Sequence, residues 1–419
     1  MENVRTFIYL ASGSHRVTLH DNQLRLSKVG LSHFILWILG NQGDYALTCT
    51  NGVHISPHGT PSDTPIAWNI YDENDGYMFK SADGILTIDG VTIFKIHKYS
   101  MKSRIGMVHW GGNYRMTNDD YLYEGAKKTM DMGITSFKIY LGTKSDKTYF
   151  TSFKHTNLHK IVQQANYRRI FEMGFRTIVI ISHYKTASYW KRLSDEERNK
   201  EMARERKELT MMAKELGKYP DVEFIISNWE GDCIINVDRT PVMFSRMVQW
   251  INNRQDAIDN AKCPNVSHAI EVNFVKQSLY GHASVTTEVL PHTRTDYVSY
   301  SCYDAQNEQE FEACVRLIQS HAGCRPLYIG EFGTPVNVRT TQQSWDYLNG
   351  IVNVMERHSI GLGCYWQLYD NEFVEVEECP TDKTTTVNRG CSNKVCKGFG
   401  IINPGKKVTG IWGVINTVW

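Results

Sequence analysis

The chain has 419 residues, of which 41% are hydrophobic and 22% are charged, a composition typical of a globular protein with enough apolar side chains for more than one core. Its 46 Lys and Arg residues nearly balance its 45 Asp and Glu residues, and a net charge of +1 excludes the strongly basic class of nucleic-acid-binding proteins. No apolar run approaches the roughly 18 residues that a membrane-spanning helix needs, so we expect no membrane partner.

The first twenty residues do not follow the plan of a secretory signal. Arg5, His15 and Arg16 surround only a short apolar patch, whereas a signal peptide has a basic start and then a longer apolar segment. This favours an intracellular location. The sequence does not indicate the oligomeric state.

Ten cysteines occur in the chain and none form a Cys-x-x-Cys pair, so a zinc site is not expected. Cys379, Cys391 and Cys396 would cross-link a surface loop in an oxidising compartment. Reduced thiols are the alternative, which the missing signal favours.

Residues 1–102 are dense in short alternating runs and turn residues, which predicts a separate all-β unit. A weak pattern recurs three times within it. The copies open at Tyr9-Leu-Ala-Ser, Tyr45-Ala-Leu-Thr and Tyr77-Met-Phe-Lys-Ser, continue at Leu24-Arg-Leu26, Val53-His-Ile55 and Leu86-Thr-Ile88, and close at Trp37-Ile-Leu39, Trp68-Asn-Ile70 and Phe94-Lys-Ile96. Over residues 4–100 this pattern resembles a β-trefoil of the fascin-like or ricin-type kind. The resemblance implies sugar binding; a packing module without a ligand is the alternative.

From Arg104 onward, apolar strand-like runs alternate with long helical patterns, as is typical of βα units around a parallel sheet. The predicted strands are Ile105-Gly112, Ser136-Gly142, Thr177-Ser182, Val222-Glu230, His268-Val275, Tyr297-Tyr303, Leu327-Phe332 and Leu362-Tyr369. The predicted helices are Asp120-Met132, Asp195-Leu216, Pro241-Ala261, Glu308-His321, Gln342-His358 and one near Val408-Val418. Eight such units predict an α/β fold, a (β/α)8 TIM barrel over residues 103–419.

Two insertions interrupt the barrel pattern, at about 143–157 and 371–397. Both follow the carboxyl end of a predicted strand, which is the active-site face of a TIM barrel. They are therefore expected to form rims or lids of a pocket, with plain surface loops as the alternative.

Two glutamates occupy strand ends on opposite sides of the predicted barrel. Glu230 ends the fourth strand and Glu331 ends the seventh. Side chains that lean inward from these strands would face each other across a central pocket with room for a sugar ring. A pair of carboxyl groups so placed can cleave a glycosidic bond, one as nucleophile and the other as proton donor.

These positions, the second within Ile329-Gly-Glu331-Phe-Gly333, resemble clan A of the glycoside hydrolases, which includes family 5. The resemblance spans roughly residues 104–419. It implies a retaining β-glycosidase with Glu230 as general acid/base and Glu331 as nucleophile, an oligosaccharide or polysaccharide as partner, and no metal or organic cofactor.

Other strand-end residues fit this resemblance. It implies that Tyr303 donates to Glu331, that His183 binds a sugar hydroxyl and that Trp366 stacks on a sugar face. His109 and Trp110, at the end of the first strand, are further candidates for substrate binding. Core packing is the alternative for each of them.

The sequence departs from the clan beside the acid/base position. Most members have an Asn directly before the acid/base Glu, where it holds the 2-hydroxyl of the sugar, but here Trp229 separates Asn228 from Glu230. Because residues two apart on a strand share a face, we expect Asn228 still to point into the pocket. Asp232 would raise the pKa of Glu230 by like-charge repulsion, or take the acid role itself. The clan's basic residue near the second strand end is not evident, Lys138 being the nearest.

The disturbed Asn-Glu spacing leaves a second interpretation open. The chain would then be a non-catalytic carbohydrate-binding or structural protein that keeps both folds. A metal hydrolase, for which His183, His109 and Asp232 would be ligands, is a weaker alternative. The sequence has no glycine-rich phosphate loop, which argues against nucleotide binding.

Overall fold

A computed structural model describes residues 5–12, 15–20, 23–27, 34–39, 44–49, 54–57, 61–62, 67–73, 76–82, 84–88, 91–98, 104–111, 114–142, 149, 157–183, 190–235, 238–323, 325–335, 337, 339–370, 372–375 and 394–418. Most of the two predicted insertions, including Cys379 and Cys391, lies outside these residues, as does the side chain of His183. Cys396 is described and has a free, buried thiol.

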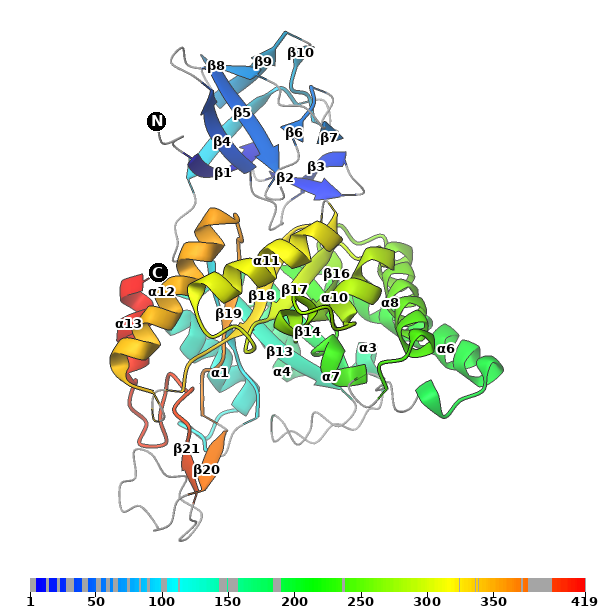
Figure 1. Ribbon diagram of the computed structural model, residues 1–419, viewed down its shortest axis with the longest axis vertical. Helices are drawn as coiled ribbons and strands as arrows, with labels where there is room; N and C mark the ends of the chain where they lie inside the picture. Colours follow the sequence, from blue (N-terminus) through cyan, green and yellow to red (C-terminus); the bar gives the residue numbers. More distant parts are fainter. Residues whose placement is uncertain are drawn as a thin grey trace.

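The N-terminal residues form short antiparallel strands, coloured from dark blue to cyan in Figure 1. They are β1 (Arg5–Ser12), β2 (His15–His20), β3 (Gln23–Ser27), β4 (Phe34–Leu39), β5 (Asp44–Cys49), β6 (His54–Ile55), β7 (Pro61–Ser62), β8 (Ala67–Glu73), β9 (Gly76–Ser81), β10 (Gly84–Ile85) and β11 (Ile93–Lys98). One pairing recurs in each predicted copy, β1 with β4, β5 with β8 and β9 with β11, while β4–β5, β8–β9 and β11–β1 join the copies. The β-trefoil assignment itself stays a prediction.

Side chains of the repeated runs form the described core of this unit. Trp68 and Phe79 pack edge to face with ring centroids 6.4 Å apart, and Ile55, Leu86 and Ile88 are buried with them. Their burial explains why apolar residues recur at these positions of the repeat.

Eight parallel strands close into a barrel, as the alternation of strand and helix patterns predicts (Figure 1). They are β12 (Ile105–Val108), β13 (Ser136–Gly142), β14 (Thr177–His183), β15 (Glu223–Ser227), β16 (Val266–Val272), β17 (Tyr297–Ser301), β18 (Leu327–Phe332) and β19 (Gly363–Tyr365). β12 pairs with both β13 and β19, which closes the ring. Two of these pairings carry a register shift, after Tyr300 and after Ile329, where β18 meets its neighbours.

Helices surround this barrel. They are α1 (Tyr121–Asp131), α3 (Leu158–Val162), α4 (Ala165–Phe171), α6 (Asp195–Leu216), α7 (Gly231–Ile235), α8 (Pro241–Ala261), α9 (Val275–Ser278), α10 (Val285–Glu288), the 3-10 turn η2 (Leu290–His292), α11 (Glu308–Ala322), α12 (Thr341–Arg357) and α13 (Gly410–Val418). The long helices start at side-chain caps; Ser194 and Thr340 form complete capping boxes with Glu197 and Gln343. The caps explain why these helix starts are readable in the sequence.

Alternation along the strands divides the barrel into two cores. One face of each strand packs against the helices in a large apolar cluster, and the other fills the barrel interior around Tyr140, Ile225 and Tyr328. A short hairpin of β20 (Phe373–Glu375) and β21 (Lys394–Cys396) follows β19.

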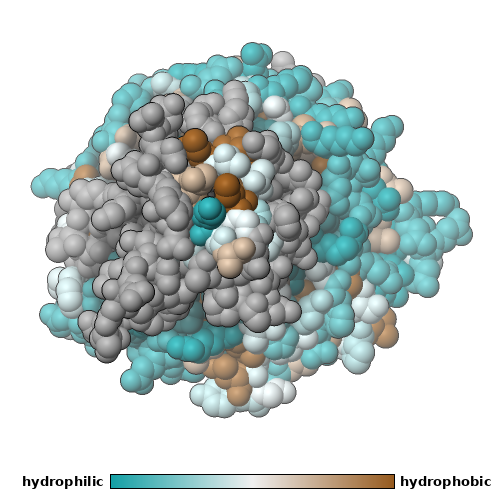
Figure 2. Space-filling model, turned by 90° about the horizontal axis from the view of Figure 1, so that it is seen from above, coloured by the Kyte–Doolittle hydropathy of each residue, from teal (hydrophilic) through white to brown (hydrophobic). Residues whose placement is uncertain are grey.

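Figure 2 views the molecule from above relative to Figure 1. Its coloured residues are mainly hydrophilic on this side, and the hydrophobic ones are scattered singly or in small groups. Among the described residues, no helix is both long and apolar enough to cross a membrane.

Candidate active site

Glu230 lies between the end of β15 and the start of α7, at the carboxyl end of the barrel. Ser301, at the end of β17, donates a hydrogen bond of 2.8 Å to Glu230 Oε1. The main-chain N–H of Glu230 donates to Glu271 Oε1 at 3.2 Å. The main chain passes close to β16 here, since a Cβ at Gly231 would lie 2.8 Å from the carbonyl oxygen of Glu271. Glu230 is thus held by two neighbouring strands.

Burial is the main cause that raises the pKa of Glu230 above its ordinary value. The charge of Glu271 acts in the same direction, while hydrogen bonds from Cys233 and Ser301 act in the opposite one. A carboxyl group with a raised pKa keeps its proton to higher pH, which suits a proton donor.

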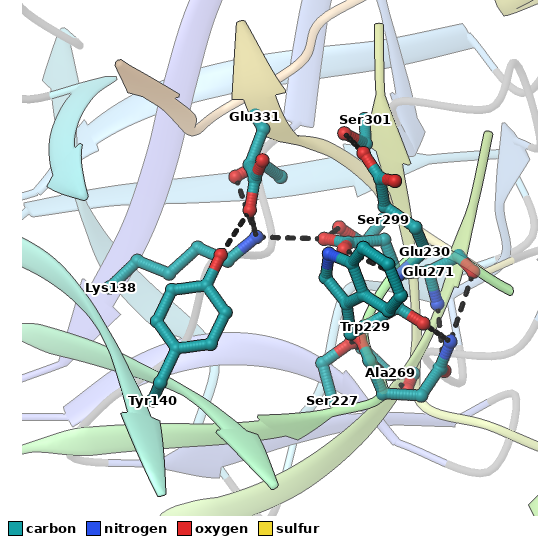
Figure 3. Close-up of polar contacts among 12 residues, drawn as sticks. Lys138, Tyr140, Ser227, Trp229, Glu230, Ala269, Glu271, Ser299, Ser301 and Glu331 are labelled. Carbon is teal, nitrogen blue, oxygen red and sulfur yellow. Dashed lines mark hydrogen bonds and ion pairs between the residues drawn. The ribbon is translucent and has the colours of Figure 1, made fainter. Parts of the chain in front are cut away.

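Glu331 lies on β18 and is buried, with only 3% of its surface exposed. Three donors surround its carboxylate: Lys138 Nζ at 2.9 Å and the Tyr140 hydroxyl at 2.5 Å on Oε1, and the Tyr303 hydroxyl at 3.5 Å on Oε2. Figure 3 shows the Lys138 and Tyr140 side chains converging on it. Burial raises the pKa of Glu331 to about 7; the charge of Lys138 opposes this, and the charges of Glu271 and Glu230 add to it.

A third carboxylate, that of Glu271 on β16, lies behind these two and is fully buried. Its Oε2 accepts from Lys138 Nζ at 2.9 Å and from Ser299 Oγ at 2.8 Å (Figure 3). Lys138 Nζ also donates to the carbonyl oxygen of Gly330 at 3.0 Å. Burial disfavours the ammonium form of Lys138, but the charges of Glu271 and Glu331 outweigh burial and raise its pKa.

Glu230 and Glu331 open into the same cavity of about 620 Å³. Its other described lining residues are mostly aromatic: Trp110, Tyr140, Trp229, Tyr303, Trp366, Glu372 and Phe399. The ring centroids of Trp110 and Trp366 lie 6.0 Å apart, and the angle between the ring planes is 31°. The two rings therefore present neighbouring flat surfaces. A second cavity, of about 540 Å³, lies near α4 and the end of α6 and contains none of the strand-end residues.

Glu372 brings part of the second insertion to this cavity. Its Oε1 accepts from Trp366 Nε1 at 2.8 Å, and its Oε2 pairs with Lys397 Nζ at 3.0 Å. These contacts orient the Trp366 ring and place one more carboxylate on the cavity wall.

The structure brings five of the predicted site residues together, Glu230, Glu331, Tyr303, Trp366 and Trp110. Asn228 does not reach the cavity wall, because both ends of its amide are used by β16: Oδ1 accepts from Glu271 N at 3.0 Å and Nδ2 donates to Glu271 O at 3.1 Å. It ties β15 to β16 where we expected a contact with the sugar.

His109 and Asp232 also lie away from the cavity. His109 is fully buried, its Nε2 is 3.0 Å from the carbonyl oxygen of Tyr121, and burial lowers its pKa to about 4. Asp232 is fully buried too and accepts from the main-chain N–H of Val285 at 2.9 Å and of Asn273 at 3.3 Å. Both residues hold segments of the barrel rim in place.

Sequence reasoning missed several residues of the site, namely Tyr140, Glu271, Trp229, Glu372 and Phe399, and it noted Lys138 only as the nearest basic residue. A signal was present for some of them. Lys138 and Tyr140 are two apart on β13, and Glu271 is a charge inside an apolar strand. Because alternate residues share a face, Lys138 and Tyr140 had to point the same way from β13.

No group of three or more His, Cys, Asp or Glu side chains in the described part of the chain is arranged to hold a metal ion. The polar groups of the described cavity wall are carboxylates, phenols and indole N–H groups, and the buried ammonium of Lys138 lies against the Glu331 carboxylate. They are suited to proton transfer and nucleophilic attack.

No protein-family model matches the chain, and no curated protein matches its sequence. Solved structures with similarity to it include a family 39 glycoside hydrolase from Bacteroides cellulosilyticus WH2, with 12% identity, 100% of this chain and 77% of that chain covered, and a TM-score of 0.47. A family 1 β-glucosidase from Thermotoga maritima has 12% identity, covers 76% of this chain and 97% of its own, and has a TM-score of 0.48. A family 5 xyloglucanase from Paenibacillus pabuli has 11% identity, covers 76% of this chain and 98% of its own, and has a TM-score of 0.46.

Proposed function

We propose that this protein is a retaining β-glycosidase in which Glu331 is the nucleophile and Glu230 the general acid/base. One observation carries the proposal: two glutamates from separate strand ends open into one aromatic-lined cavity of about 620 Å³. Carbohydrate sites combine carboxylates, which accept hydrogen bonds from hydroxyl groups, with aromatic rings, which stack on the C–H faces of sugars.

The donors to Glu331 support its role as nucleophile, because the charge of Lys138 and the hydrogen bond from Tyr140 oppose the burial that raises its pKa to about 7. Lys138 and Tyr140 both donate to Oε1, whereas Oε2 has, among the described residues, the longer contact to Tyr303 and would attack the anomeric carbon. Burial raises the pKa of Tyr140 well above its ordinary value, so this phenol keeps its proton and remains a donor.

The surroundings of Glu230 support the complementary role. Its raised pKa favours the protonated form that gives a proton to the leaving oxygen. After the leaving group departs, the ionised Glu230 would take a proton from water, and that water would release the sugar from Glu331. The anomeric configuration would be retained, because each of the two displacements inverts it.

The cavity wall indicates the kind of substrate. Trp110 and Trp366 offer adjacent rings, and Glu372 offers an acceptor for hydroxyl groups beside them. We infer a β-linked oligosaccharide or polysaccharide of glucan or mannan type as the substrate class.

The test compares wild type with Glu331→Ala, Glu230→Ala and the matched control Glu223→Gln on aryl β-glycosides and on glucan and mannan oligosaccharides. Glu223 is also a buried glutamate of a barrel strand, but it begins β15, at the opposite end of the barrel. We expect Glu331→Ala to lower kcat on the order of 10⁴-fold or more, and the control to keep full activity.

Glu230→Ala should depend on the leaving group. Because general acid catalysis is worth about 10²- to 10⁴-fold, kcat/KM should fall in that range for alkyl or sugar leaving groups and little for nitrophenols, which need no proton. The value of kcat should fall for both kinds of substrate, because Glu230 is also the base of the second step. A slow fluorinated aryl glycoside should leave its sugar attached to the peptide that contains Glu331, detectable by mass spectrometry. Sugar binding without turnover on any substrate would instead support the non-catalytic interpretation.

A further inference from the structure

Glu271 touches both halves of the candidate site, and none of the roles proposed above uses it. Its Oε1 accepts the main-chain N–H of Glu230 at 3.2 Å, and its Oε2 accepts Lys138 Nζ at 2.9 Å. The same ammonium donates to Glu331 Oε1 at 2.9 Å. A chain of contacts thus runs from Glu230 through Glu271 and Lys138 to Glu331 (Figure 3).

This arrangement is closely packed on every side. Ser299 Oγ donates to Glu271 Oε2 at 2.8 Å, and Gly330 leaves room for the carboxylate, since a Cβ at that position would collide with Glu271 and Ser299. The Glu271 and Lys138 side chains are both fully buried. A buried carboxylate with this many directed contacts holds its neighbours in place and is costly to lose.

We propose that Glu271 is a positioning residue that holds both candidate catalytic carboxylates in place relative to each other, and that its negative charge sets the pH range in which the site works. This inference rests on the function proposed above. It concerns a residue that touches no substrate and acts through Lys138 and the main chain of Glu230.

The charges around Glu271 give the direction of the effect. Among the described residues, the titratable groups that act on it are Lys138 and Tyr140 on β13, Glu230 after β15, Tyr328 and Glu331 on β18 and Cys364 on β19. Its charge raises the pKa values of both Glu230 and Glu331. Removal of that charge would therefore lower both pKa values.

The first variant is Glu271→Gln. An amide has one acceptor oxygen where the carboxylate has two, so Gln can keep the contact to Lys138 or the contact to Glu230 N but not both. We expect kcat/KM to fall about 10- to 100-fold, because the reacting groups lose their alignment. Both the acid and the basic limb of the pH profile of kcat/KM should move to lower pH.

Two further variants separate charge from geometry. Glu271→Asp keeps the charge but shortens the side chain, so its kcat should fall while both limbs stay at the wild-type pH. Glu223→Gln, the buried control at the other end of the barrel, should change neither kcat nor the position of the two limbs of the pH profile. If Glu271→Gln does not fold by circular dichroism, the Asp variant alone decides, and a wild-type kcat in that variant overturns the proposal.

A measurement without substrate keeps this proposal apart from the proposed function. The carboxyl carbon of Glu331 can be titrated by ¹³C NMR, with Glu331→Gln to identify its signal. A midpoint at lower pH in Glu271→Gln than in wild type supports the inference, even if wild type hydrolyses no glycoside and the glycosidase proposal fails. An unchanged midpoint, or an unchanged pH profile in an active enzyme, overturns it.

Discussion

The ammonium of Lys138 directs three hydrogen bonds to three acceptors: Glu271, Glu331 and the carbonyl oxygen of Gly330. Since a Lys side chain has three hydrogens to donate, this one has none left for a substrate. In the proposed reaction, Lys138 would therefore act through charge and position alone. The contact of Tyr303 to Glu331 is longer, at 3.5 Å.

The pKa of Glu331 leads to a prediction about pH. Burial raises it to about 7, and attack requires the ionised form, so kcat/KM should fall as the pH falls below about 7. An aryl glycoside with a good leaving group, assayed between about pH 5 and 8, isolates this limb, because such a substrate does not need protonated Glu230.

The Glu230→Ala variant is the internal check on this assignment. The charge of Glu230 raises the pKa of Glu331, so its removal should move the acid limb to lower pH than in wild type. An acid limb near pH 4.5 in wild type, the ordinary value for a glutamate, would contradict the assignment.

At the scale of elements, β18 depends on Gly330. A Cβ there would collide with the Ser299 hydroxyl and the Glu271 carboxylate, and both side chains are fully buried. Gly330→Ala should therefore lower the free energy of unfolding by about 1–3 kcal/mol, the usual cost of overpacking a core, and should lower activity as well. Denaturant unfolding followed by fluorescence measures the first effect.

Gly413 on α13 is the matched control for this change. A Cβ at Gly413 has no neighbour within 4 Å, and alanine is the better helix former. Gly413→Ala should leave the free energy of unfolding unchanged or raise it by up to about 1 kcal/mol. Equal effects of the two substitutions would show that the space around Gly330 does not matter.

The elements of the barrel could be predicted from the sequence because their signals are local. Asp195–Leu216 and Pro241–Ala261 begin at a Ser and a Thr cap and keep a helical period, so both bounds match the prediction. Glu230 and Glu331 could be picked out in the same way, because each lies near the carboxyl end of an apolar run, but Glu271 and Glu372 could not.

The contacts between strands could not be predicted in this way. Lys138 and Glu271 are 133 positions apart in the chain, and nothing local indicates that their side chains meet. Asn228 shows the other difficulty: its position after β15 is visible in the sequence, but its hydrogen bonds to the main chain of β16 are not. Side-chain direction at a strand end depends on the neighbouring strand.

At the scale of the whole molecule, the barrel holds every residue assigned to the reaction. The described cavity residues lie between Trp110 and Phe399 in the sequence, and among them none belongs to the N-terminal strands. We predict that residues 103–419 alone fold and hydrolyse small aryl glycosides with wild-type kcat/KM. Circular dichroism and the same kinetic assay test this.

The N-terminal unit should matter only for long substrates. If it binds sugars, as the β-trefoil resemblance implies, its removal should raise KM for a polysaccharide and leave KM for an aryl glycoside unchanged. A truncated protein that folds but has lost activity on the aryl glycoside would contradict this division of roles.

The close packing of Lys138, Glu271, Ser299 and Gly330 also restricts how related chains can differ. Each of the four comes from a different strand, and a Cβ at position 330 would occupy the space of the Glu271 carboxylate. A relative with a larger residue there must also have given up the glutamate, and one without the glutamate has little reason to retain the lysine. These positions should therefore change together during evolution, and a protein engineer who moves the arrangement to another barrel must transfer all four at once.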